Sequence, residues 1–205
     1  MMFGIGNGSG RIGLRIGIGV AAAGLLIIGI GRLRSSETNV ALQEPDYGHV
    51  PQFSLIDSSS RVVTHDHLRG KVWIADFIFT SCAGMCPMMS SQMRKLQDTL
   101  PAEIQLVSIT VDPSRDTPEV LAHYSKQYGA DSRWMFLTGD KQALHDLSIK
   151  GFKLGVDDTQ GTEAEPITHS ARFVLVDRDG RIRGYFSGTE EDALNTLIAE
   201  AKRLL

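Results

Sequence analysis

The stretch Val72-Trp-Ile-Ala-Asp-Phe-Ile-Phe-Thr-Ser-Cys-Ala-Gly-Met-Cys-Pro87 decides the fold, because it joins a buried strand to the start of a helix. Its first half, Val72–Phe79, is too continuously apolar for a strand with one face in solvent, so we expect a central strand. Pro87 suits the first helical position, where its missing N–H leaves no donor unsatisfied. A helix is therefore expected to begin at Pro87.

Cys82 and Cys86 lie at this junction and are the only cysteines of the chain. The second sulfur falls at a helix N-terminus, where the macrodipole favours thiolate over thiol. A thiolate is both a nucleophile and a ligand for soft metals. The spacing alone leaves three uses open: a metal site, a redox dithiol or a structural disulfide.

The elements around this junction alternate between strands and helices. A hairpin is expected around the polar turn that starts at Asp57. The other expected strands are Ile104–Val111, Trp134–Leu137, Arg172–Val176 and Ile182–Phe186. The expected helices run from Pro87 to about Leu100, Thr117 to Tyr128, Asp140 to about Ile149, and from a capping box at Thr189 and Asp192 to Leu205.

This order predicts an α/β sandwich with a mixed sheet flanked by helices. A dithiol between a buried strand and a helix, then a βα unit and a terminal ββα, resembles the thioredoxin fold. The N-terminal hairpin and the helix from Thr117 resemble the insertions of its peroxiredoxin-like branch.

The first 34 residues differ from the rest, with four arginines, no acid and many glycines. Residues 16–31 form an uncharged run of about 24 Å as a helix. Counted from Ile12, with Arg15 reaching to the interface, the run attains the roughly 20 residues that span a bilayer. No convincing small-x-small cleavage site precedes Ser35, so an uncleaved signal anchor at 1–34 is favoured over a cleaved signal peptide. Residues 35–50 are expected to be a linker to a domain at 51–205.

The charge balance outside the anchor is acidic. Without those four arginines the chain keeps 17 basic and 24 acidic residues, a net charge of about −7. This argues against nucleic acid as a partner and favours basic or cationic partners. Export across the membrane would place the cysteines in an oxidising compartment, where a dithiol persists only if it is re-reduced or metallated.

Two further motifs accompany the dithiol and complete a resemblance. The three pieces are Phe79-Thr-x-Cys82-x-x-x-Cys86-Pro87, Asp112-x-x-x-Asp116-Thr-Pro118 and the late His169. Together they resemble the SCO/SenC family, membrane-anchored copper-binding proteins that help assemble the CuA centre of cytochrome c oxidase. The resemblance covers about residues 50 to 203. One departure is Ala83-Gly84, where a Pro-Asp pair is common in the family.

The resemblance implies a copper metallochaperone, not an enzyme in the turnover sense, whose soluble domain lies on the extracytoplasmic side. Its metal ligands would be Cys82, Cys86 and His169. Its partners would be a copper donor protein and the oxidase subunit that carries the CuA site. Asp112 and Asp116 would belong to a partner-docking surface, or would only end a strand and start a helix.

The ligand chemistry fits copper without reference to the family. Two thiolates suit Cu(I), and a neutral imidazole extends the site to Cu(II). Two cysteines and one histidine are too few for a closed tetrahedral zinc site. Met85 is expected inside the loop and more open, with a transient copper contact as the less favoured alternative, whereas the helical spacing of Met89 and Met93 indicates core positions.

Asp76 supports a rival reading, an exported thiol–disulfide oxidoreductase that acts through Cys82 and Cys86. It interrupts a strand that should be buried, where an unpaired carboxylate is costly. It also precedes Cys82 by six residues, the register of the buried acid in thioredoxins, which exchanges a proton with the dithiol. The alternative is that Asp76 bonds a backbone amide or a basic side chain and only shapes the strand.

Overall fold

The computed structural model describes residues 47–157 and 168–205, so the expected anchor and most of the linker lie outside the described residues. The strands are β1 (Ser54–Asp57), β2 (Val62–Thr64), β3 (Trp73–Ile78), β4 (Gln105–Thr110), β5 (Trp134–Thr138), β6 (Val156–Asp157), β7 (Thr168–His169), β8 (Arg172–Val176) and β9 (Ile182–Ser187). The helices are η1 (His65–His67), α2 (Met85–Thr99), α3 (Pro118–Gln127), α4 (Lys141–Asp146), the π-helical turn η2 (Leu147–Gly151) and α5 (Glu191–Arg203). In this part of the chain no helix has the length and apolar character that a bilayer crossing needs.

A seven-stranded mixed sheet carries the fold, in the order β2-β1-β5-β4-β3-β8-β9. Strands β3, β4 and β5 are parallel, whereas β8 and β1 add antiparallel to the two sides of this group. All six residues of β3 are buried, which confirms the expected central strand. The mixed α/β architecture expected from the sequence is therefore confirmed.

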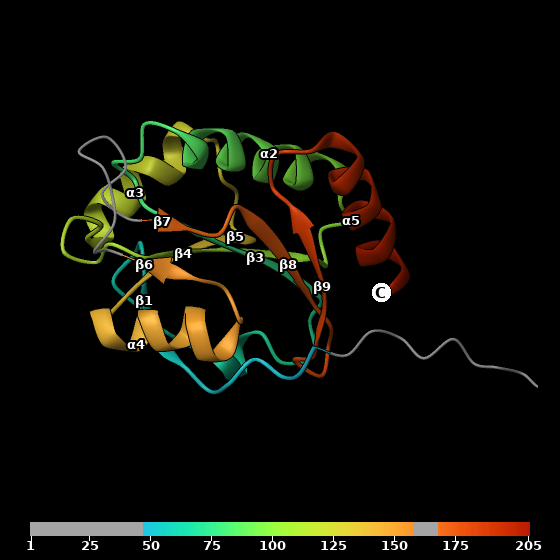
Figure 1. Ribbon diagram of the computed structural model, residues 1–205, viewed down its shortest axis with the longest axis horizontal. Coiled ribbons are helices and arrows are strands. Elements are labelled where there is room, and N and C mark those ends of the chain that lie inside the picture. Colours follow the sequence, from blue (N-terminus) through green and yellow to red (C-terminus); the bar gives the residue numbers. More distant parts are fainter. Residues whose placement is uncertain (1–46, 158–167) are drawn as a thin grey trace, which may run out of the picture. The chain divides into compact units, whose positions relative to one another are not determined.

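Helices cover both faces of this sheet, with α2, α3 and α5 on one face and α4 on the other (Figure 1). Trp73 and Phe77 of β3 both make edge-to-face ring contacts with Phe152, which directly follows η2 on the α4 side. Side chains alternate between the faces of a strand, so Asp76 points to the opposite face, toward α2. The sheet thus places a carboxyl group under the helix that carries Cys86.

The N-terminal caps show where the local sequence controls helix starts. The Thr117 side chain accepts a hydrogen bond from the Val120 N–H, with Pro118 in the first turn, as expected. Asp140 caps α4 in the same way. The capping box expected at Thr189 is wrong, because the Thr189 hydroxyl pairs with Ser187 and α5 has no side-chain cap.

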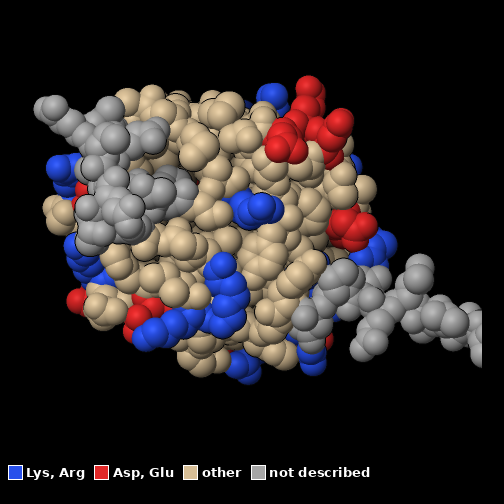
Figure 2. All heavy atoms as spheres, viewed as in Figure 1, with Lys and Arg blue, Asp and Glu red and all other residues tan. Residues whose placement is uncertain are grey.

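The start of α5 has acidic side chains in its first turn and no side-chain cap. Figure 2 shows them gathered over this end of the helix, where Glu190, Glu191 and Asp192 are all exposed. Lys202 and Arg203 lie in the last turn. Acidic side chains at the N-terminus and basic ones at the C-terminus both interact favourably with the helix dipole, and each stabilises the helix by about 0.3–1 kcal/mol.

The outer edge of β9 is partly covered by the segment that enters the domain. Tyr47 N–H donates to the Ile182 carbonyl at 3.1 Å, and Ile182 N–H donates to the Gly48 carbonyl at 2.8 Å. His49 forms a bridge with Arg181. Residues 47–50, which the sequence places in the linker, therefore pair with the sheet.

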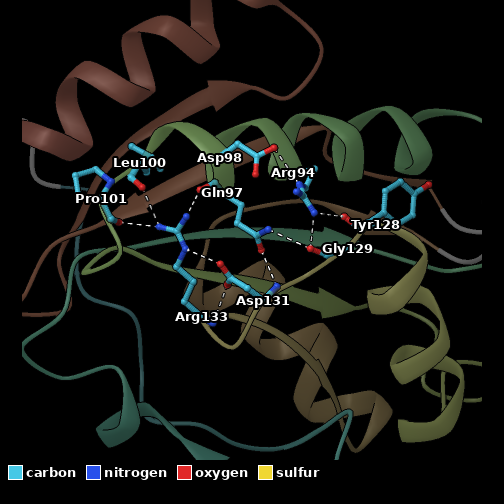
Figure 3. Close-up of polar contacts among 9 residues, drawn as sticks. All are labelled: Arg94, Gln97, Asp98, Leu100, Pro101, Tyr128, Gly129, Asp131 and Arg133. Carbon is cyan, nitrogen blue, oxygen red and sulfur yellow. Dashed lines mark hydrogen bonds and ion pairs between the residues drawn. The ribbon is translucent and has the colours of Figure 1, made fainter.

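Arg133 closes the C-terminal end of α2 (Figure 3). Its guanidinium donates to the Leu100 and Pro101 carbonyls at 3.0 and 2.8 Å and to the Gln97 carbonyl. The last carbonyls of a helix have no partner within the helix, so one buried cation satisfies several acceptors at the negative end of the dipole. The Gln97 amide in turn donates to the Gly129 carbonyl after α3, which ties the two helices together.

We expect Arg133→Gln to lower the free energy of unfolding by about 1–3 kcal/mol, because it leaves carbonyl groups at the end of α2 without a donor. Urea unfolding followed by circular dichroism measures this. Arg203→Gln is the control, since the exposed Arg203–Glu200 pair should contribute below about 1 kcal/mol. Equal losses in the two variants would contradict the role given to Arg133.

Candidate metal centre

The two cysteines lie together at the junction between β3 and α2. Helix α2 begins at Met85, two residues earlier than expected, so Cys86 lies in its first turn and Cys82 in the loop before it. The Cys86 N–H points to the Cys82 sulfur at 3.5 Å, and the Cys82 N–H donates to the Phe79 carbonyl at 3.3 Å. Both cysteines are free thiols. The backbone thus brings the two sulfurs to the same point at the carboxyl end of the central strand.

Burial outweighs the helix terminus at Cys86. Its side chain is fully buried, and this burial raises the pKa of the Cys86 thiol more than a hydrogen bond to the Phe79 backbone lowers it. The expectation that the dipole leaves a thiolate here is therefore wrong for the metal-free chain. A soft cation that binds both sulfurs has to displace protons, so its binding would release acid.

Asp76 lies beneath the dithiol without a hydrogen bond. Its side chain is fully buried, and neither carboxyl oxygen has a partner among the residues that the structure describes. Burial raises the pKa of Asp76 to about 7, against a smaller lowering from the nearby Ser108 hydroxyl. That hydroxyl accepts from the Trp134 indole at 2.9 Å and keeps its own proton to donate. Both roles considered for Asp76, proton exchange with the dithiol and support of the strand, stay predictions.

The backbone of His169 lies in β7, and its side chain is outside the described residues. His169 pairs with Val156 of β6, three residues before β8. Because β8 runs antiparallel to β3, the start of β8 lies at the end of β3 that carries the dithiol. A Cβ added at Gly188 would lie 3.1 Å from the Met89 side chain of α2 and 3.2 Å from the Ala171 carbonyl. The backbone of His169 belongs to the separate two-stranded sheet β6-β7 and precedes Ala171, which lies near Met89, by two residues.

Within the described residues, no three His, Cys, Asp or Glu side chains gather as a metal site. The described part of the centre consists of the two thiols and the carboxyl group of Asp76 below them. Two thiols at this distance are able to bind a soft ion or to form a disulfide. The third ligand expected from the sequence, His169, remains a prediction.

Asp116 holds the loop that leads to Cys82. Its buried carboxyl group accepts from the Thr80 N–H at 3.1 Å and from the Thr80 and Thr110 hydroxyls, each at 2.5 Å. Burial raises the pKa of Asp116, while these three donors lower it. Asp116 is fully buried, so its expected place on a docking surface is wrong: it fastens the end of β3 to the loop before α3.

Asp112 is also almost wholly buried, and it orders the same loop. Its carboxylate accepts from the Ser114 hydroxyl at 2.5 Å and lies 3.6 Å from the Arg115 guanidinium. Arg115 reaches the Ser81 hydroxyl beside Cys82 at 3.4 Å. The second of the two readings, in which these acids end a strand and start a helix, describes them better.

Several residues that support the centre were missed from the sequence. Thr80 and Thr110 bond Asp116, and the Ser90 hydroxyl pairs with the Tyr124 hydroxyl at 2.8 Å between α2 and α3. Each hydroxyl follows or belongs to a buried apolar run, where it needs a partner. Thr80 lies 36 residues from Asp116, and Ser90 lies 34 residues from Tyr124, so no local pattern joins these two pairs. Thr110 lies only six residues from Asp116, and this contact could have been found from the sequence.

Asp76 predicts a pH dependence of stability. Its pKa is about 7 in the folded chain and about 4 when unfolded, so the folded state holds the extra proton between these values. The free energy of unfolding should therefore fall as the pH rises from 4 to 7 and level off above 7. Asp76→Asn removes this titration, and relative to wild type it should gain up to about 4 kcal/mol across that window. Urea unfolding at a series of pH values measures it; parallel profiles for the two proteins would refute the raised pKa.

Asp116→Ala should lower the free energy of unfolding by about 3 kcal/mol, because it leaves three donors without their acceptor. The loop at Thr80 should also loosen, so Cys82 should react faster with iodoacetamide. Asp98→Ala is the control: it removes only an exposed ion pair with Arg94, and should cost below about 1 kcal/mol. An unchanged alkylation rate would show that Asp116 does not hold the loop.

The sequence comparisons agree with this geometry. The family model described as SCO1/SenC matches residues 42–205. A curated relative, the SCO1 protein homolog of Bacillus subtilis, is 32% identical over 166 residues, which cover 78% of this chain and 85% of the relative.

Solved structures give the same result. A SCO1/SenC family lipoprotein from Bacillus anthracis is 30% identical with a TM-score of 0.71, over 80% of this chain and 98% of that one. BsSco, described with a disulfide switch and as a member of the Sco family of cytochrome c oxidase assembly proteins, is 31% identical with a TM-score of 0.68, over 78% and 94%.

A copper-bound structure is also among the matches. Bradyrhizobium japonicum ScoI with copper bound is 26% identical with a TM-score of 0.61, over 77% of this chain and 100% of that one. The dithiol at the end of β3, the fold around it and a family match over most of the sequence agree: this chain belongs to the SCO1/SenC family.

Proposed function

We propose that this protein is a copper metallochaperone that assists assembly of the CuA centre of cytochrome c oxidase. The observation that carries the proposal is a pair of neighbouring cysteines, with the Cys82 sulfur 3.5 Å from the Cys86 backbone nitrogen, at the end of a buried strand in a chain of this family. Copper is cargo in this function, because the protein has to receive it from a donor and pass it to the oxidase subunit.

Cys82, Cys86 and His169 are the proposed ligands. Thiolate sulfur is the preferred donor for Cu(I), and imidazole nitrogen accommodates Cu(II) as well. The burial of both sulfurs supports tight retention, since water has little access to the ion. A three-ligand site leaves room for an incoming ligand of the acceptor, which a cargo ion needs in order to leave.

The proposed location is the extracytoplasmic side of a membrane, with residues 1–34 as the anchor. The support is the uncharged run at 16–31 and the presence of a lipoprotein among the related structures. Residues 35–46 would then tether the folded domain to the bilayer surface.

A second function, thiol–disulfide exchange through Cys82 and Cys86, is favoured by one observation. Asp76 is a buried carboxyl group whose oxygens have no hydrogen-bond partner in the described part of the chain, and its pKa of about 7 suits proton exchange near neutral pH. It lies under the buried sulfur of Cys86, whose proton must leave before that sulfur can attack a disulfide. The same dithiol is able to serve both functions in turn.

Substitution of His169 separates the two functions. If His169 binds copper, His169→Ala should keep two titratable thiols and still form the Cys82–Cys86 disulfide. Its Cu(II) form should lose or shift the thiolate-to-copper absorption, because one nitrogen ligand is gone. Copper titration of the reduced protein, read by metal analysis and visible absorption, measures both effects.

Two controls accompany this titration. His123→Ala removes an exposed imidazole from α3 and should leave stoichiometry and spectrum unchanged. Replacement of either cysteine by serine should abolish copper retention and disulfide formation together. If His169→Ala binds one copper with the spectrum and affinity of wild type, His169 is not a ligand.

A further inference from the structure

Copper that arrives from solvent meets a nearly closed dithiol. Only 7% of Cys82 and none of Cys86 is exposed. The outer surface at this point is made by four exposed residues of the loop and the helix start: Ser81, Ala83, Gly84 and Met85. Among these side chains only Met85 has an atom soft enough to bind Cu(I). Among the described side chains at this surface, the first ligand available to the ion besides Cys82 is therefore a thioether.

Met88 supplies a second thioether on the same surface. Met85 is the first residue of α2, and residues three apart on a helix are neighbours, with about 5–6 Å between their Cβ atoms. Met85 is 38% exposed and Met88 42%. Met89 and Met93 are fully buried, as expected for core positions. Helix α2 thus has two methionines in the core, Met89 and Met93, and two on the surface near the dithiol, Met85 and Met88.

We propose that Met85 and Met88 form a surface uptake site that holds Cu(I) before Cys82 and Cys86 receive it. The proposal rests on the proposed copper function. In the first step two copper–thioether bonds replace the bonds to the donor's ligands. In the second step two copper–thiolate bonds replace these, and the two thiol protons pass to solvent. Copper stays Cu(I) throughout, so no electron is exchanged.

The neutral thioethers suit a transient role. A thioether carries no proton, so its bond to copper forms without the deprotonation that the buried Cys86 thiol requires. It carries no negative charge either, so it holds Cu(I) less tightly than a thiolate does. Copper should therefore move inward, from Met85 and Met88 to the cysteine sulfurs.

The rate of copper uptake tests the proposal. The full-length reduced chain in detergent is mixed in a stopped-flow instrument with the Cu(I)–bicinchoninate complex, whose colour fades as copper leaves it. Met85→Leu/Met88→Leu keeps apolar side chains of similar volume but removes both sulfurs. We expect at least a five-fold slower uptake, with one copper per chain and the final thiolate–copper absorption unchanged. Met93→Leu, which removes a buried sulfur from the same helix, should match wild type.

A direct readout comes from the thioethers themselves. In Cys82→Ser/Cys86→Ser with ¹³C-methyl-labelled methionine, added Ag(I), a redox-inert analogue of Cu(I), should shift the methyl signals of Met85 and Met88 but not that of Met93. Uptake as fast as wild type in the double leucine variant overturns the uptake site, and so does the absence of those methyl shifts. If wild type itself binds no copper on its cysteines, the copper function fails instead, which metal analysis of wild type shows separately.

Discussion

The burial of β3 on both faces and along both edges is the constraint on which the rest of the structure depends. A strand with β4 on one side, β8 on the other and helices over both faces has no freedom to shift its register. Its last residue fixes where Phe79 and Thr80 begin the loop. The dithiol is anchored to this strand end: the Cys82 N–H donates to the Phe79 carbonyl, and the Cys86 N–H points to the Cys82 sulfur. Asp116, in the loop between β4 and α3, accepts from the Thr80 N–H. A metal site built from a loop is thereby held almost as firmly as one built on a sheet.

Two opposing electrostatic effects meet at Cys86, and their balance bears on function. The helix terminus favours a thiolate, whereas burial disfavours any charge, and at full burial the second effect is larger. Asp76 adds a potential negative charge below the same sulfur. Burial thus keeps the Cys86 thiol protonated and weakly nucleophilic in the metal-free chain. A soft cation overcomes the penalty because it brings its own positive charge to the buried pair.

The sequence predicted what depends on local pattern and burial. The central strand, the hairpin at Asp57 and the caps at Thr117 and Asp140 are all confirmed. Each of these features depends on residues that are close together in the sequence. The two cysteines were placed correctly for the same reason.

Effects that act across the fold were missed. The sequence left Asp116 open between a docking surface and a strand end, because its partner Thr80 lies 36 residues away in the chain. The pKa of Cys86 was judged from its helix position, although the depth of burial, a property of the assembled core, decides it. The cap at Thr189 failed because its hydroxyl found a closer partner in Ser187.

The segment that enters the domain at Tyr47 has a consequence for handling the protein. Strand β9 lies at the margin of the sheet, and residues 47–50 occupy part of its outer backbone groups. Unpaired backbone groups at a strand edge pair with strands of other chains. A fragment that begins after residue 50 would therefore expose the edge of β9 and tend to self-associate. The short stretch before β1 therefore protects the exposed edge of the sheet. A soluble fragment of this protein should begin well upstream of residue 47.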